Sequence, residues 1–192
     1  MADTDENRAS SYEELASGMR AVHVTRIGEM PRIQLYLDQV LTFVNEELSF
    51  MEVPGEVALT GSMVNNYVKQ HVIPAPEKKR YTRRHLATLL FVCAFKRAFS
   101  MAQVKAILDM CHDSDVDMAR AYDDLCGVIE HAIATEFPPV ADERDSGLAA
   151  DVHFFDEAGS EVATDVARLM GSGVVCVVSK VYVEQMLLLA EG

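Results

Sequence analysis

The stretch that decides the fold is residues 59–110, LTGSMVNNYVKQHVIPAPEKKRYTRRHLATLLFVCAFKRAFSMAQVKAILDM. Apolar residues recur in it at helical spacing in three blocks, and each block follows a hydroxyl residue suited to cap a helix. The caps that we expect are Thr60 or Ser62, then Thr82, then Ser100. The stretch therefore predicts a short helix over 62–70, a long buried helix through Phe99 and a third helix after Ser100.

The short helix has two different faces. Met63, Val64, Tyr67 and Val68 can point into a core, and the outward face carries Asn65, Asn66, Lys69 and Gln70. Asn and Gln can bond adenine edges through two hydrogen bonds, so such a face can read bases in the major groove. The alternative is that Asn65 and Asn66 form only an exposed polar surface.

Charge is distributed unevenly along the chain, whose formal net charge is −13 over 192 residues. Residues 59–108 hold nine basic residues and one acid, Glu77, so this segment is +8 and the remainder is −21. A local basic field suits phosphate contact, whereas the global sum mainly affects solubility and steering. The densest basic patch is Lys78, Lys79, Arg80, Arg83 and Arg84. The alternative for this patch is a solvated helix face and loop.

The segments before residue 59 differ in composition. Residues 1–26 are acidic and polar with few large apolar residues, which indicates a disordered leader. Pro31 is suited to a first helical turn, and a helix is expected to follow it. Its apolar stripe is Ile33, Leu37, Val40, Leu41, Val44 and Leu48.

Beyond residue 110 the clearest pattern is an amphipathic helix that ends at Pro138 and Pro139. Its apolar positions step by three or four from Val116 to Phe137. A polar linker follows. In the last segment the valine run favours a strand, but the length without a turn favours a helix, and we expect the helix.

Residues 59–110 resemble the MerR family of helix-turn-helix regulators. The corresponding motifs are VNNY at 64–67, HVIP at 71–74, KRYT at 79–82 and AFSMAQVKAIL at 98–108. The resemblance implies a recognition helix over 62–70 and a wing over 78–84. It places Lys79 and Arg80 at the phosphate-contacting end of the wing, with Tyr81 buttressing the wing or touching the backbone.

With IGEMPRIQLYLDQVLTFVNEEL at 27–48, the chain is more similar to an uncharacterised bacterial family, the domain-of-unknown-function family numbered eighteen thirty-six. The runs LYLDQV and MVNNYVKQHVIPAPEKKRYTRRHLATLL carry this resemblance, which covers about residues 27–137. Two departures from MerR are Asn65, where many members have Arg, and His71, where Gly is usual. The wing is short, and the long dimerising coiled coil of MerR is missing.

Other function classes lack support in the sequence. The four cysteines are far apart and lie in apolar stretches, so we expect neither a disulfide framework nor a zinc site. Asp113, Asp115 and Asp117 begin like a calcium loop, but Met118 stands where glycine is needed. There is no Gly-rich phosphate loop and no nucleophile elbow. We expect no enzyme, no metal and no cofactor.

The expected fold class is mostly α, a MerR-like winged helix-turn-helix domain followed by additional helices. Its parts are a leader (1–26), the helix-turn-helix domain (27–110), an amphipathic helix for dimerisation or core packing (111–137), and a linker with a C-terminal helical segment (138–192). The expected DNA-contact residues are Ser62, Asn65, Asn66, Lys69, Gln70, Lys78, Lys79, Arg80, Tyr81, Arg83 and Arg84.

These patterns predict a cytoplasmic, homodimeric transcriptional regulator that binds double-stranded DNA and no membrane. A small-molecule effector is left open as a further partner. The alternative function is a protein-interaction or small-molecule-sensing module that keeps the fold without binding DNA. The −13 charge and Asn65 favour that alternative.

Overall fold

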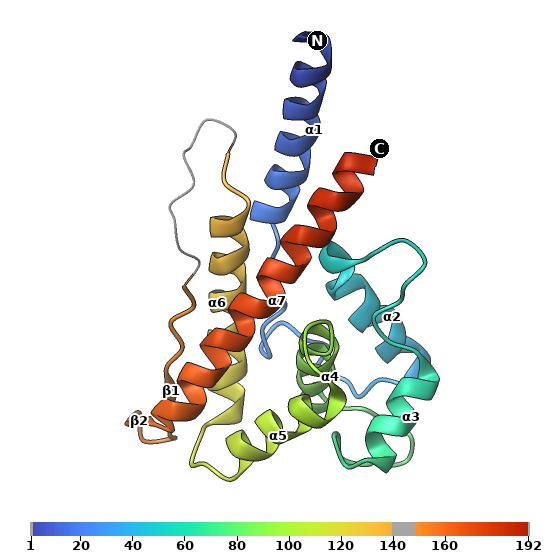
Figure 1. The fold of residues 1–192 in the computed structure, drawn as a ribbon. Helices are drawn as coiled ribbons and strands as arrows, with labels where there is room; N and C mark the ends of the chain where they lie inside the picture. The colour runs from blue at the N-terminus through green and yellow to red at the C-terminus, as the bar shows by residue number, and fades with distance from the viewer. Residues whose placement is uncertain (1, 140–148, 192) are drawn as a thin grey trace.

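The computed structural model describes residues 2–139 and 149–191, and within these ranges the chain is mostly helical, as expected (Figure 1). The α-helices are α1 (Ala2–Arg20), α2 (Leu37–Glu47), α3 (Gly61–Lys69), α4 (Arg83–Phe95), α5 (Met101–His112), α6 (Met118–Glu136) and α7 (Thr164–Glu191). A 3-10 turn, η1 (Ser49–Met51), follows α2. Strands β1 (Phe154–Phe155) and β2 (Glu161–Val162) form an antiparallel hairpin.

The expectation of a disordered leader at 1–26 is wrong, because Ala2–Arg20 forms helix α1. Ala16 and Met19 of α1 are buried in the core. The Arg20 guanidinium donates to the Phe137 carbonyl at 3.0 Å, just beyond the end of α6. The partly buried Tyr12 and Leu15 also pack against this core, so apolar contacts and a few tertiary hydrogen bonds hold a segment whose composition does not signal them.

Helix α2 starts later than Pro31 predicts. Leu35 is extended and pairs with Tyr81 through two backbone hydrogen bonds of 2.9 and 2.8 Å, so the helix begins only at Leu37. The backbone N–H of Tyr36 donates to the Gln39 side chain at 3.0 Å and closes the helix start. Ile33, expected in the apolar stripe, is consequently 71% exposed. Val40, Val44 and Leu48 are buried as expected.

The three helices of residues 59–110 start where local capping chemistry indicates. Thr60 is the cap of α3 and accepts from the Met63 N–H at 3.3 Å; Ser62 instead lies exposed in the first turn. Thr82 and Ser100 precede α4 and α5. Helix α4 ends at Phe95, four residues earlier than expected, and residues 96–98 form a turn.

The C-terminal segment is helical, which confirms the helix over the strand alternative. Helix α7 is a single element from Thr164 to Glu191, and the β1–β2 hairpin before it was not foreseen. The amphipathic helix is confirmed as α6, and it starts at Met118 because Asp117 caps it by accepting from the Ala119 and Arg120 N–H groups. Most of the expected linker, residues 140–148, lies outside the described residues.

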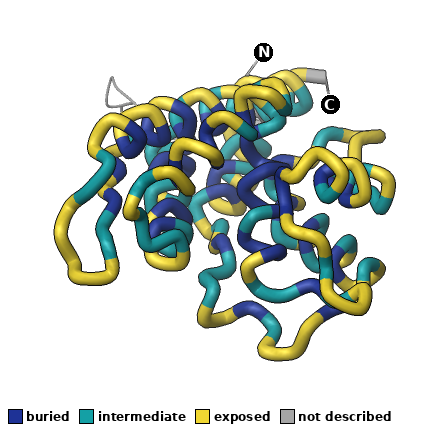
Figure 2. Tube along the Cα trace, turned by 90° about the horizontal axis from the view of Figure 1, so that it is seen from below, coloured by how far each residue is buried: buried dark blue, intermediate teal, exposed yellow. Residues whose placement is uncertain are grey.

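Helix α4 lies at the centre of the core and is buried on nearly every side (Figure 2). Helix α7 crosses it closely: a Cβ built on Gly173 would lie only 2.7 Å from Cε1 of Phe95. The Phe95 ring also stacks on Phe91, with centroids 4.3 Å apart. The central and C-terminal helices therefore share one core. In that core α6 packs against α1 and α7.

Within the described residues, α7 is also long and apolar enough to pass as a membrane span. The most apolar 18-residue window within Thr164–Ala190 has a mean hydropathy of 1.6. This is weak support for a membrane, because core helices of soluble proteins meet the same criterion of length and composition. The cytoplasmic location stays a prediction.

Candidate nucleic-acid interface

Helix α3 presents a polar face to solvent and an apolar face to the core. Asn65, Asn66, Lys69 and Gln70 are exposed, whereas Val64 and Tyr67 are buried. Burial raises the pKa of Tyr67 to about 12, so its hydroxyl stays protonated. An amide pair also forms on the outer face, where Gln70 Nε2 donates to Asn66 Oδ1 at 3.2 Å. The predicted division of α3 into two faces is confirmed.

A side chain of α2 fixes the approach to α3. The Asn45 amide donates to the Leu59 carbonyl at 3.0 Å and accepts from the Leu59 N–H at 2.9 Å. Leu59 is buried directly before the Thr60 cap. This two-way hydrogen bond sets the position of α3 relative to α2, and the sequence pattern did not identify Asn45.

Helix α3 is followed, after its C-cap Gln70, by a left-handed residue, His71, with φ of 56°. The N–H of Val72 donates to the Tyr67 carbonyl at 2.9 Å, and the N–H of His71 donates to Val68 at 3.1 Å. This is the hydrogen-bond pattern of a Schellman motif, whose left-handed position glycine normally fills. His71 therefore occupies a glycine position at some conformational cost, and the chain turns sharply out of α3 there.

Lys78 and Lys79 form the tip of a tight turn, residues 77–80. Both have positive φ, 48° and 60°, and the N–H of Arg80 donates to the Glu77 carbonyl at 2.8 Å. Two left-handed central residues define the turn type that joins twisted hairpin strands, which usually carries Asn-Gly. Both lysines are exposed. The turn thus holds two ammonium groups at the tip of a hairpin-like segment.

The base of this turn is attached to the segment before α2. Tyr81 is only 4% exposed and pairs with Leu35, as described above. Next to it the Arg80 guanidinium lies over the Tyr36 ring, 3.8 Å from the centroid. The buried position of Tyr81 fits a buttress beneath the turn, and it leaves little of the side chain for direct contact with a ligand.

The two arginines that begin α4 differ in their surroundings. Arg83 donates to the Met30 carbonyl at 2.8 Å and to the Pro31 carbonyl at 3.2 Å, so it holds the segment before α2. Arg84 is exposed, and the structure gives its guanidinium no hydrogen-bond or carboxylate partner among the described residues. Arg83 is therefore partly structural, and Arg84 is available.

His85 anchors the start of α4 beneath the turn. Its Nδ1 accepts from the Thr82 backbone N–H at 3.1 Å, and its ring meets Tyr81 edge-on with centroids 5.5 Å apart. Burial lowers the pKa of His85. A neutral imidazole is the form that can accept this hydrogen bond, so burial and capping favour the same protonation state.

The cations of the chain fall into two groups by their partners. Among described side chains, those with a carboxylate partner are Arg20, Arg26, Arg97, Lys105, Arg120, Arg168 and Lys180. Lys96 has no carboxylate partner but donates to a backbone carbonyl. The other described cations without a carboxylate partner are Arg32, Lys69, Lys78, Lys79, Arg80, Arg83 and Arg84. We call this second set the interface cations. They all come from α3, the segment before α2, the 77–80 turn and the first turn of α4.

Three basic residues of the 59–108 segment do not belong to this surface. Lys96 donates to the Ala58 carbonyl, Arg97 is 12% exposed and pairs with Glu184 of α7, and Lys105 pairs with Asp109 within α5 at 2.7 Å. The acids Glu77 and Asp38 are exposed on the interface elements. The basic surface therefore carries less positive charge than the +8 of residues 59–108 indicated.

One interface cation, Arg32, was missed because the basic segment was counted from residue 59. Arg32 is exposed and follows Pro31, whose carbonyl accepts from Arg83. The bridge between Leu35 and Tyr81 brings this segment beside the turn. Only a contact between residues far apart in the chain identifies Arg32, so no local signal could have found it.

Comparison with known proteins places the chain in a family. The model of the family described as Domain of unknown function (DUF1836) matches residues 25–125, and the chain belongs to this family. The match covers helices α2 to α5, the segments that carry the interface cations and the start of α6. No curated protein and no solved structure matches the chain.

Proposed function

We propose that this protein is a DNA-binding transcriptional regulator of MerR-like helix-turn-helix type. In this proposal α3 is the recognition helix, with Asn65, Asn66, Lys69 and Gln70 toward base edges. The 77–80 turn is the wing, with Lys78 and Lys79 on phosphates. The protein acts in the cytoplasm and is not an enzyme. It is a homodimer in this proposal, because one short recognition helix reads few base pairs.

The observation that carries the proposal is the segregation of cations by pairing. A chain with 30 acidic and 17 basic residues has enough carboxylates to pair every cation. Nevertheless, the interface cations lack carboxylate partners, while the cations of α1, α6 and α7 with described side chains have them. Unpaired cations around a helix with an exposed amide face are what phosphate and base contact require.

The test is fluorescence anisotropy of the purified protein with labelled duplexes, one random and one from the region upstream of its own gene. Affinity should fall steeply with salt, because each neutralised phosphate contributes about −0.9 to the slope of log K against log salt. Tighter binding to the upstream duplex would support sequence-specific regulation. Absence of binding at low salt would refute the proposal.

A double variant separates wing charge from fold. Lys78→Asn with Lys79→Gly removes both ammonium groups and installs the dipeptide that this turn type prefers. The variant should bind both duplexes more weakly and lower the magnitude of the salt slope by about two. The control, Arg168→Gln with Lys180→Gln, makes the same change in net charge on α7 and should bind as the parent does. Equal losses in both variants would show a net-charge effect only.

The second candidate function is a protein-interaction module without DNA binding. It is favoured by the net charge of −13 and by the internal contacts of Arg80 and Arg83. Mutation of α3 discriminates the two: Asn66→Ala should change the preference between duplexes under the first proposal, whereas the second requires no duplex binding in the parent protein. Size-exclusion chromatography with light scattering tests the dimer in either case.

A further inference from the structure

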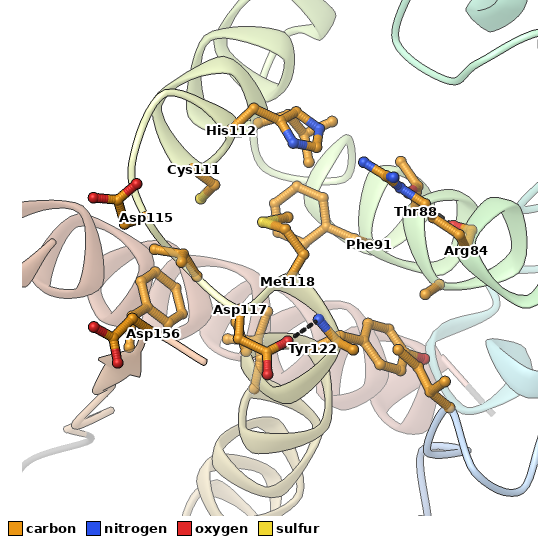
Figure 3. A pocket seen from close by; sticks show the side chains of 18 of the residues that line it. Arg84, Thr88, Phe91, Cys111, His112, Asp115, Asp117, Met118, Tyr122 and Asp156 are labelled. Atoms are coloured by element: carbon orange, nitrogen blue, oxygen red, sulfur yellow. Dashed lines mark hydrogen bonds between the residues drawn. The ribbon is translucent and has the colours of Figure 1, made fainter. Parts of the chain in front are cut away.

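A cavity of about 820 Å³ lies between α4, α5, α6 and the β1–β2 hairpin (Figure 3). Its inner wall is apolar and includes Phe91, Leu125, Phe154 and Met170. Cavities of this volume with mostly apolar walls and a few polar groups are the usual sites of small-molecule binding. None of the exposed amide face of α3 lines it, and of the interface cations only Arg84 does.

The charged groups at its mouth are unbalanced. Among the described residues, four carboxylates line the cavity, those of Asp115, Asp117, Asp156 and Glu157, against one guanidinium, Arg84, and the imidazole of His112. In Figure 3 Asp115 and Asp156 lie on one side and Arg84 on the other, with Phe91 and Met118 between them. The field inside the cavity therefore favours a positive charge on the acidic side.

Two of the four carboxylates are fixed by the backbone, and two are free. Asp117 accepts from the Ala119 N–H at 3.0 Å, and Asp156 accepts from the Ser160 N–H at 2.8 Å. Asp115 and Glu157 are exposed, and the structure gives neither a partner among the described residues. The fixed pair supplies a constant negative potential, and the free pair can approach a ligand.

From these observations we propose that the cavity binds an organic cation with a bulky apolar body. The cationic group lies against Asp115 and Glu157, and the apolar body covers Phe91 and Met118. The side chains of Tyr122 and Phe154 also line the cavity and add to its apolar wall. The Cys111 thiol in the wall takes no covalent part, because burial raises its pKa to about 11.

The site spans the boundary of the family match. Arg84, Phe91 and Asp115 lie within residues 25–125, whereas Phe154 and Glu157 lie beyond them. The ligand would therefore bridge the two parts of the chain. The proposal does not depend on DNA binding, because the ligand titrations that test it contain no DNA.

The test uses two probes of the same shape and opposite charge, tetraphenylphosphonium and tetraphenylborate. Isothermal titration calorimetry on the full chain should give an affinity at least tenfold higher for the cation. Similar affinities for both probes would show nonspecific apolar binding and overturn the proposal. No heat of binding with millimolar tetraphenylphosphonium would overturn it as well.

Variants then locate the bound cation. Asp115→Asn with Glu157→Gln should weaken tetraphenylphosphonium binding roughly tenfold, because two nearby charges are lost in a partly shielded site. The control, Glu14→Gln with Glu46→Gln, removes two exposed charges on α1 and α2 and should change affinity less than twofold. Arg84→Gln should strengthen binding. Equal weakening by both double variants, or unchanged affinity in the first, would overturn the assignment of this cavity.

Discussion

The surface around α3 and the side formed by α1, α6 and α7 use charge in opposite ways. On the α6 side Arg26 meets Glu130 through two hydrogen bonds of 2.6 and 2.7 Å, and the N–H of Val24 donates to the same carboxylate at 2.8 Å. Around α3, Lys69, Lys78 and Lys79 project into solvent. One region uses ionic groups to join distant segments, and the other leaves them without carboxylate partners.

The comparison teaches which charges the fold depends on. A half-buried, hydrogen-bonded ion pair leaves an unsatisfied group when one partner is removed, whereas an exposed lone cation contributes little to stability. Substitutions around α3 can therefore test binding without unfolding the chain. Substitutions at Arg26 or Glu130 cannot.

The largest expected effect tests whether the two regions share one core. Phe95→Ala should lower the free energy of unfolding by about 3–5 kcal/mol, because Phe95 is buried between Phe91 and Gly173 of α7. Urea unfolding followed by circular dichroism should still show one transition. The half-buried Phe99 is the control, and Phe99→Ala should cost less. Two separate unfolding transitions in the parent protein would show that the two regions are independent domains and do not share one core.

The second effect concerns the paired side. Glu130→Gln should destabilise the protein by about 2 kcal/mol at neutral pH, since it weakens a charge-assisted contact with Arg26 and the Val24 N–H. The hydrogen bond from Arg26 lowers the pKa of Glu130 below its ordinary 4.5 in the folded state. Its contribution is thus present above pH 4.5 and is lost as pH falls through the lower folded value.

Urea titrations of the parent and the Glu130→Gln variant at several pH values measure this contribution. The difference between them should shrink steadily below pH 4.5. Glu46→Gln, on the exposed face of α2, is the control and should show almost no difference. A constant difference across the acid range would mean that the ion pair does not stabilise the fold.

A third, opposite effect sharpens the comparison on the α3 side. Lys78→Asn with Lys79→Gly should stabilise the protein by about 1–2 kcal/mol, because it relieves two left-handed lysines at the tip of the 77–80 turn. Lys78→Ala with Lys79→Ala removes the same charges without that relief and should give no gain. Thermal unfolding of both double variants distinguishes conformational relief from the removal of repulsion.

The smallest effect is at the end of α3. His71→Gly should stabilise by about 0.5–1 kcal/mol, since glycine adopts the left-handed position of the Schellman motif at no steric cost. The neighbouring Gln70 has φ of −87°, and Gln70→Gly should be destabilising instead. Chemical denaturation resolves the two signs. Stabilisation by both glycines would contradict the capping geometry.

Sequence patterns predicted best where the cause lies within four residues. The cap at Thr60, the starts of α4 and α5, and the two faces of α3 follow from local hydrogen bonding and helical period. The packing of helix α1, by contrast, depends on contacts with residues more than one hundred positions away in the chain. One such contact is the hydrogen bond from Arg20 to the carbonyl of Phe137. Composition alone therefore suggested disorder there.

The candidate interface was predicted in part for the same reason. The exposed amides and the two turn lysines could be identified from the period and the charge run. Lys96 and Arg97 make internal contacts and so do not belong to the basic surface, whereas Arg32 does belong to it. Both facts depend on which distant segments pack against one another. The cavity beside Phe91 could not be located at all, because its walls come from five separate stretches of the chain.

The bridge between Leu35 and Tyr81 has a consequence for hydrogen exchange. It closes a loop that contains the whole of residues 36–80, including α2 and α3. The amide hydrogens of Leu35 and Tyr81 are both bonded across this closure, at 2.9 and 2.8 Å. They should exchange with deuterium together, at a rate set by the undocking of an entire segment and not by fraying of one strand.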